Sequence, residues 1–172
     1  MKNFLKKIGF LPKENQDEIF IKKYGSYSLE VDFKKSIFDY GGKIIFSESK
    51  KTIQNITKPE DWVVFECVNR LLEKGYKPED IVLEKVYPTG HGTSGRLDIL
   101  VKKEGKAFLM IECKTWGKEF EKEFKNLQKK GGQLFTYFQQ DRDTEYLMLY
   151  TSSSNKEKIE YENQIIKIEE DY

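Results

Sequence analysis

Residues 96–114, RLDILVKKEGKAFLMIECK, decide the fold of this chain. Two apolar runs flank a short polar segment with one glycine, a pattern typical of two antiparallel strands joined by a hairpin turn. With a three-residue turn, the strand positions place Asp98 directly opposite Glu112. Opposed residues point to the same face of a sheet, with Cβ atoms roughly 4.5–5.5 Å apart. Lys114 follows Glu112 by two positions and therefore shares that face.

Two facing carboxylates repel each other, so one must take up a proton or both must share a cation. Their oxygens suit Mg²⁺ or Mn²⁺ better than zinc, and the backbone carbonyl of Cys113 could supply a further ligand. Such a metal would activate water for attack on a phosphate, while Lys114 would orient that water or stabilise the transition state. The pattern indicates phosphodiester hydrolysis by Asp98, Glu112 and Lys114. The alternative, ordinary strand-end charges, is disfavoured because both carboxylates lie inside apolar strands.

Three further polar residues lie on the helices expected around this hairpin. Gln133 and Tyr137 are four positions apart on one helix and so share one face. They could hold a phosphate, the backbone of the cleaved strand or the catalytic lysine, or they could simply be helix surface. Glu66 lies among apolar residues four positions before Arg70. An ion pair with Arg70 and a role at the metal site are both compatible with that position.

Around the hairpin, the periodicity of apolar residues predicts an α/β core with mixed strand directions. We expect a helix over 59–74, with a Thr57–Glu60 capping box and a buried face of Trp62, Phe65, Val68, Leu71 and Leu72. Further elements are predicted as a strand over 81–87, a loop over 88–95, a helical stretch over 118–140 broken at Gly131–Gly132, and a strand over 145–153 buried on both faces.

The N-terminal part reads as a separate, smaller unit. Three short alternating runs, EIFIKKY, YSLEVDF and GGKIIF, predict an antiparallel meander within residues 18–46. A polar stretch follows. We therefore divide the chain into an N-terminal β-rich subdomain over 1–50 and an α/β domain over 58–172.

GRLD, ECK and QLFTY together resemble the G-x-h-D, (D/E)-x-K and Q-x-x-x-Y motifs of PD-(D/E)xK nucleases. The resemblance is to the N-terminal nuclease domain of type I restriction enzyme R subunits and related restriction–modification fusion proteins. It covers residues 59 to about 153, and Leu97 stands where the family name has proline.

The resemblance implies a restriction-endonuclease-like fold, a mixed sheet flanked by helices, and Mg²⁺- or Mn²⁺-dependent cleavage of double-stranded DNA. Asp98 and Glu112 match the metal ligands, Lys114 the catalytic lysine, Gln133 and Tyr137 the motif after the sheet, and Glu66 a helix acid that many members have. It further implies a downstream translocase or methyltransferase domain and a target-recognition unit. The alternatives are a catalytically silent DNA- or subunit-binding module of the same fold, and a recombination exonuclease or resolvase.

Composition limits the setting of this activity. The net charge of +1 gives no global attraction to DNA, so that any binding surface must be a local patch. His91, in the expected 88–95 loop, could contact phosphate or merely be exposed. Two cysteines in apolar runs do not make a disulfide framework and suit a cytoplasmic protein. No signal peptide or long apolar run is visible, so we expect no membrane association.

Overall fold

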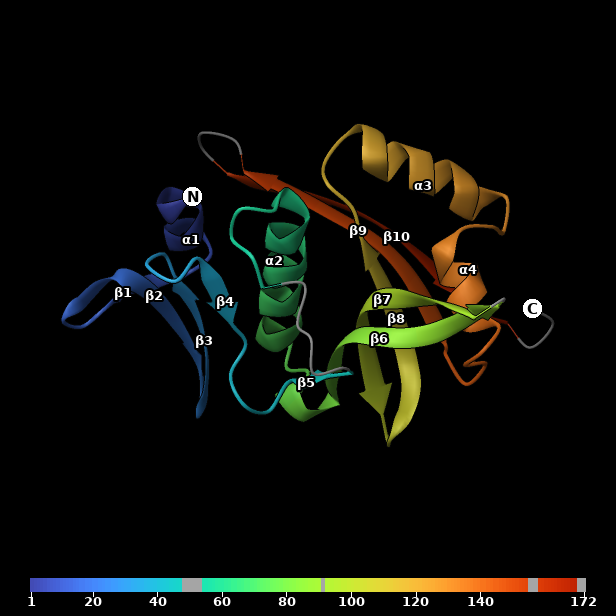
Figure 1. The fold of residues 1–172 in the computed structure, drawn as a ribbon, viewed down its shortest axis with the longest axis horizontal. Helices are drawn as coiled ribbons and strands as arrows, with labels where there is room; N and C mark the ends of the chain where they lie inside the picture. The colour runs from blue at the N-terminus through green and yellow to red at the C-terminus, as the bar shows by residue number, and fades with distance from the viewer. Residues whose placement is uncertain (48–53, 91, 155–157, 170–172) are drawn as a thin grey trace.

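The computed structural model describes residues 1–47, 54–90, 92–154 and 158–169. It is an α/β structure with a four-stranded antiparallel sheet and a mixed six-stranded sheet. Figure 1 shows α2 between the two sheets. Among the described helices, none is long and apolar enough to cross a bilayer.

The smaller sheet has the order β1-β2-β3-β4 and packs beside a short helix, α1. These elements are α1 (Lys2–Lys7), β1 (Leu11–Lys13), β2 (Gln16–Tyr24), β3 (Tyr27–Asp32) and β4 (Ile37–Asp39). Alternation in β3 buries Tyr27, Leu29 and Val31 on one face, which confirms the expected antiparallel sheet. The prediction that GGKIIF is its third strand is wrong. β4 takes that place, and β5 (Ile45–Phe46) instead pairs in parallel with the larger sheet.

The larger sheet has the order β10-β9-β8-β7-β6-β5, with parallel pairing only between β5 and β6 and between β8 and β9 among its described strands. Its other strands and connecting elements are the 3-10 turn Pro78–Asp80, β6 (Ile81–Gly90), β7 (Thr93–Lys103), β8 (Lys106–Cys113), β9 (Tyr146–Ser154) and β10 (Ile159–Lys167). Strand β9, between β10 and β8, is buried from Leu147 to Ser152, which confirms the prediction that both of its faces are covered.

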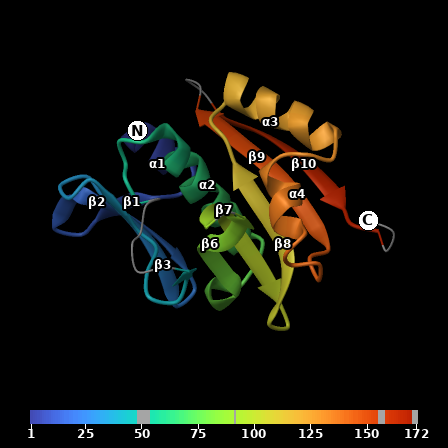
Figure 2. The ribbon, with the colours of Figure 1, turned by 45° about the vertical axis from the view of Figure 1, so that its right-hand side comes forward.

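Helices cover both faces of the larger sheet (Figures 1 and 2). α2 (Pro59–Glu73) packs on one face and also contacts the N-terminal sheet, so that apolar side chains line it on most sides. α3 (Lys118–Gln128) and α4 (Gln133–Phe138) pack on the other face, separated at Gly131–Gly132 as expected. The five apolar residues predicted to form the buried face of α2 are all buried.

Two local predictions are wrong. The N-cap of α2 is Lys58 without a side-chain cap, because the Thr57 hydroxyl bonds Asn55 instead of closing a capping box. Residues 88–90 and 93–95 are not loop, since β6 extends to Gly90, β7 begins at Thr93, and the two strands pair there as a hairpin. His91 lies outside the described residues.

The β7–β8 hairpin has the predicted register but a different turn. Its turn is the two-residue Glu104–Gly105, whose φ values of 53° and 77° are typical of a type I′ hairpin. A β-bulge just beyond the turn then shifts the register by one residue, and Ile99 pairs with Ile111. Asp98 and Glu112, the next residue on each strand, are therefore neighbours.

Candidate active site

Asp98 and Glu112 form a carboxyl pair on adjacent strands. Oδ2 of Asp98 accepts a hydrogen bond of 2.8 Å from the backbone N–H of Cys113, and the charges of the two carboxyl groups interact. Glu112 is only 2 % exposed, whereas Asp98 keeps a partly exposed edge. Cys113 ends β8, so its carbonyl lies at the same end of the strand. The hairpin thus brings together the two acids that the sequence singled out.

Burial shifts the pKa of both carboxyl groups upward. Burial raises the pKa of Glu112 well above its ordinary value, and the charge of Asp98 raises it further. Burial also raises the pKa of Asp98, although its interaction with Glu112 and the hydrogen bond from the Cys113 N–H oppose that rise. Within the described part of the chain, Oε2 of Glu112 is buried without a hydrogen-bond partner. Glu112 is therefore the carboxyl that retains a proton in the absence of a cation.

Lys114 extends from the end of β8 toward α4. Its backbone N–H donates to the Tyr150 carbonyl at 3.0 Å, and its Nζ donates to Oε1 of Gln133 at 2.9 Å. Burial lowers the pKa of Lys114, but the carboxylates led by Glu112 outweigh burial, and the net shift is upward. The lysine is therefore a cation at neutral pH. From the sequence, a phosphate, the DNA backbone and the catalytic lysine were possible partners of Gln133. In the structure its partner is Lys114.

Tyr137 lies on α4 one turn beyond Gln133. Its hydroxyl donates to the carbonyl of Arg96 at 3.2 Å, and its ring stacks on Tyr87 with centroids 5.3 Å apart. Burial, followed by the charges of Glu112 and Asp98, raises the pKa of Tyr137 to about 12. The phenol is thus neutral, faces β7, and lies within the electrostatic influence of the carboxyl pair.

Glu66 makes the ion pair that was one of its two expected roles. Arg70 Nε donates to Oε1 of Glu66 at 2.7 Å, and the hydroxyl of Tyr150 donates to Oε2. Glu66 is 1 % exposed. Both of its carboxylate oxygens are therefore engaged within the core, and no contact with Asp98 or Glu112 involves it.

Two acids that the sequence analysis did not select do lie near the pair. Glu60, in the first turn of α2, has its pKa raised by burial and by Asp98, while Lys114 lowers it. Glu84 is buried on β6 between residues that pair with β7 on either side of Asp98. Its φ of 54° is unusual within a strand. Two sequence features could have identified these acids. Glu84 is an acid inside the apolar run IVLEKVY, and Glu60 is an acid in the first turn of the predicted helix.

No family model matches the chain, and no curated protein matches it. In the ranges that the structure describes, no group of three or more His, Cys, Asp and Glu side chains is arranged to hold a metal ion.

Proposed function

We propose that this chain is a DNA nuclease of restriction-endonuclease-like fold that uses Mg²⁺ or Mn²⁺ to hydrolyse phosphodiester bonds. One observation carries the proposal. Asp98 and Glu112 form a buried carboxyl pair with an unsatisfied oxygen, and the cationic Lys114 lies beside it. In an ion pair that only stabilises the fold, the carboxylate oxygens have hydrogen-bond partners. Here Oε2 of Glu112 has none among the described residues, so it can bind a cation.

The carboxyl pair fits a hard divalent cation. Asp98 and Glu112 would hold it, since carboxylate oxygens are the ligands that Mg²⁺ prefers and Oε2 of Glu112 has no partner among the described residues. A bound cation would supply Lewis acidity to activate water and positive charge to neutralise the phosphate. It would also allow Glu112 to give up its proton, because the repulsion from Asp98 would then be offset.

The remaining residues position charge. Lys114 carries a positive charge at neutral pH, so it would bind the scissile phosphate and stabilise negative charge in the transition state, and it would not act as a base. Gln133 accepts its hydrogen bond and fixes the direction of the ammonium group. Tyr137, by bonding the Arg96 carbonyl, ties α4 to the strand that carries Asp98.

The biological setting is a finer part of the same proposal. The three motifs support a restriction–modification protein of the cytoplasm, acting on double-stranded DNA. A translocase or methyltransferase domain and a target-recognition unit would select the DNA. The free thiols of Cys67 and Cys113 are consistent with a reducing compartment.

Incubation of supercoiled and linear DNA with the purified chain tests the proposal. We expect cleavage with Mg²⁺ or Mn²⁺, none with EDTA, and a loss of about a hundredfold or more in Glu112→Gln. Glu162→Gln, an exposed acid on β10, is the matched control and should cleave as the parent does. If the parent binds DNA but cleaves neither form with either cation, the chain is a binding module and the proposal is wrong.

A further inference from the structure

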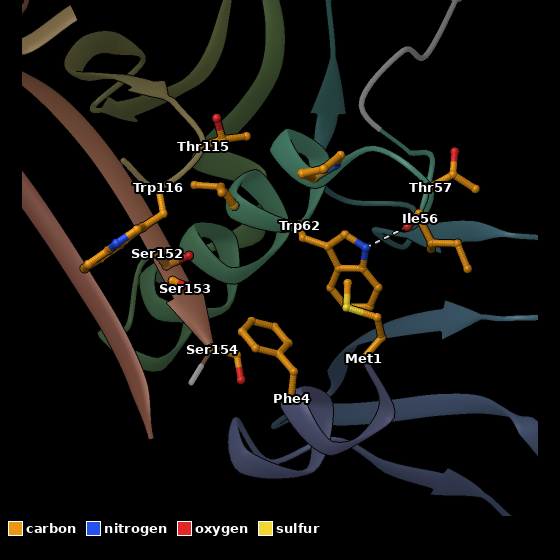
Figure 3. Close-up of a pocket in the computed structure, with 12 residues that line it drawn as sticks. Met1, Phe4, Ile56, Thr57, Trp62, Thr115, Trp116, Ser152, Ser153 and Ser154 are labelled. Carbon is orange, nitrogen blue, oxygen red and sulfur yellow. Dashed lines mark hydrogen bonds between the residues drawn. The ribbon is translucent and has the colours of Figure 1, made fainter. Parts of the chain in front are cut away.

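A pocket of about 470 Å³ opens between α1, the start of α2, the segment after β8 and the end of β9 (Figure 3). Figure 3 shows Phe4 and Trp62 on one side and Trp116 with Ser152–Ser154 on the other. Its volume is within the range of small-molecule sites, which is roughly 300–1,000 Å³. The polar site described above does not use this pocket.

The lining combines aromatic surface with hydroxyl groups. Phe4 and Trp62 meet edge to face with ring centroids 5.7 Å apart, and Trp116 is 40 % exposed. Hydroxyls of Thr115, Ser152 and other serine and threonine residues interrupt this apolar surface. No charged side chain is among the described residues that line it. Such a site suits a flat, uncharged group with hydrogen-bonding edges.

The pocket adjoins the proposed catalytic site. Pro59 lines it and precedes Glu60, and Thr115 lines it and follows Lys114. Glu60 and Lys114 interact electrostatically, so the two chain segments that carry them also form one rim of the pocket. A DNA strand with a phosphate at Lys114 would therefore bring a nucleotide to the mouth of the pocket.

We propose that this pocket binds one unpaired nucleobase of the DNA strand whose backbone occupies the Asp98–Glu112–Lys114 site. The inference rests on the proposed nuclease function and specifies its substrate class. A base in a duplex is stacked and paired on its hydrogen-bonding edge, so only a displaced base can enter. The preferred substrate is DNA with a single-stranded, frayed or bulged nucleotide beside the scissile phosphate, with Trp116 as the stacking platform.

The intrinsic fluorescence of the chain is sensitive to what binds in this pocket. It contains two tryptophans, Trp62 and Trp116, and both line the pocket. Tryptophan fluorescence therefore measures occupancy there. We expect a short single-stranded oligothymidylate, added in EDTA so that no cleavage occurs, to quench this fluorescence. An abasic oligomer of equal length and charge should not. A duplex with one bulged base should quench more than the fully paired duplex.

Substitution at Trp116 separates stacking from general attraction to phosphate. Binding of labelled oligothymidylate, measured by anisotropy, should weaken roughly ten- to a hundredfold in Trp116→Ala, which is the loss caused by removing one base–aromatic stack. Trp116→Phe should retain most of the affinity. Tyr161→Ala is the matched control, because Tyr161 is 49 % exposed on β10 and is not part of the pocket. Trp62 remains as the fluorescent reporter in all these variants.

The outcomes separate this inference from the proposed nuclease function. Equal quenching by the abasic oligomer, or parental affinity in Trp116→Ala, overturns the base-binding role even if the chain cleaves DNA. The pocket would then be an apolar surface for a protein partner. Base-dependent quenching that Trp116→Ala removes supports the pocket even if no cation yields cleavage.

Discussion

The Tyr137 side chain occupies the space that a side chain at residue 95 would fill. A Cβ atom on Gly95 would lie 2.6 Å from the Tyr137 hydroxyl oxygen and 2.8 Å from its Cε1. The phenol cannot easily move, because Tyr137 is 2 % exposed and stacks on Tyr87. The glycine three positions before Asp98 and the tyrosine four positions after Gln133 therefore meet in space. This contact gives both residues a physical reason to be in the two motifs.

Replacement of Gly95 by alanine should displace Tyr137 from β7. We expect a loss of about 1–3 kcal/mol in unfolding free energy, typical of overpacking, and reduced DNA cleavage. Gly131→Ala is the matched control, because a Cβ there would meet its nearest atom at an ordinary 3.5 Å. Urea denaturation of both variants measures the difference. A Gly95→Ala variant as stable as Gly131→Ala would contradict the contact.

A double variant tests whether the two residues act through each other. Tyr137→Phe alone loses the hydrogen bond to Arg96, worth about 0.5–1.5 kcal/mol, but it also removes the atom nearest to the new Cβ. Gly95→Ala combined with Tyr137→Phe should therefore lose less stability than the sum of the single losses. Strict additivity would show that Gly95 does not contact the phenol in solution.

Asp61 predicts how stability changes with pH. Burial raises the pKa of Asp61 to about 6, against the opposing hydrogen bond from Asn55 and the charge of Lys58. Asp98 and Glu84 raise it further. Because the folded state binds the proton more tightly than the unfolded state, this carboxyl stabilises the fold at low pH. That contribution is lost as the pH rises toward about 6.

Asp61→Asn should remove this pH dependence. The amide oxygen can still accept the hydrogen bond from the Asn55 N–H, and no charge is buried at any pH. Above about pH 6, we expect the variant to be more stable than the parent by up to about 3 kcal/mol. Near pH 4 the two should be equal. Thermal unfolding across this range in EDTA measures the effect, and an equal gain at every pH would rule out titration of Asp61 as its cause.

The sequence predicted the placement of Asp98 beside Glu112 correctly, although with a turn that the structure does not have. The predicted turn was one residue too long, yet the β-bulge in the hairpin compensates and brings Asp98 beside Glu112. Apolar periodicity also predicted α2, and the Gly131–Gly132 pair predicted the break between α3 and α4. The glycines of the 88–95 segment predicted a loop, because glycine is typical of turns. In the structure Gly90 and Gly92 have positive φ at the end of a hairpin, a conformation that glycine adopts without strain.

The local sequence pattern does not show which acid of α2 lies near the carboxyl pair. Glu60 and Glu66 are six residues apart, so on a helix of 3.6 residues per turn they point in different directions. Which direction faces the carboxyl pair depends on how α2 docks between two sheets, and that is set by distant residues such as Phe38 and Tyr150. The sequence therefore suggested Glu66, and the packing places Glu60 near Lys114.

Divalent-cation binding should follow the carboxyl pair and not Glu66. Calorimetric titration with Mn²⁺ should show binding to the parent that Asp98→Asn or Glu112→Gln abolishes. Glu66→Gln is the control, because Arg70 and Tyr150 already engage its oxygens, and it should bind Mn²⁺ as the parent does. Unchanged affinity in both Asp98→Asn and Glu112→Gln would remove the pair from the metal site.

Lys114 should matter to the chemical step rather than to cation binding. Its ammonium group is protonated and so offers no lone pair to a metal, yet it lies beside the carboxyl pair. Lys114→Ala should slow DNA cleavage by about a hundredfold to a thousandfold while Mn²⁺ affinity changes little. Lys106→Ala, an exposed lysine at the opposite end of the same strand, is the matched control.

Gln133 should act only through Lys114, since its Oε1 accepts the hydrogen bond from Nζ. Gln133→Ala frees the ammonium group without removing its charge, so we expect a loss of about tenfold to a hundredfold, smaller than that of Lys114→Ala. In a Lys114→Ala background the same substitution should have almost no further effect, because the group that it positions is gone. Single-turnover cleavage with saturating Mn²⁺ measures all three variants. A full additional loss in the double variant would show that Gln133 contacts the DNA directly and would refute its positioning role.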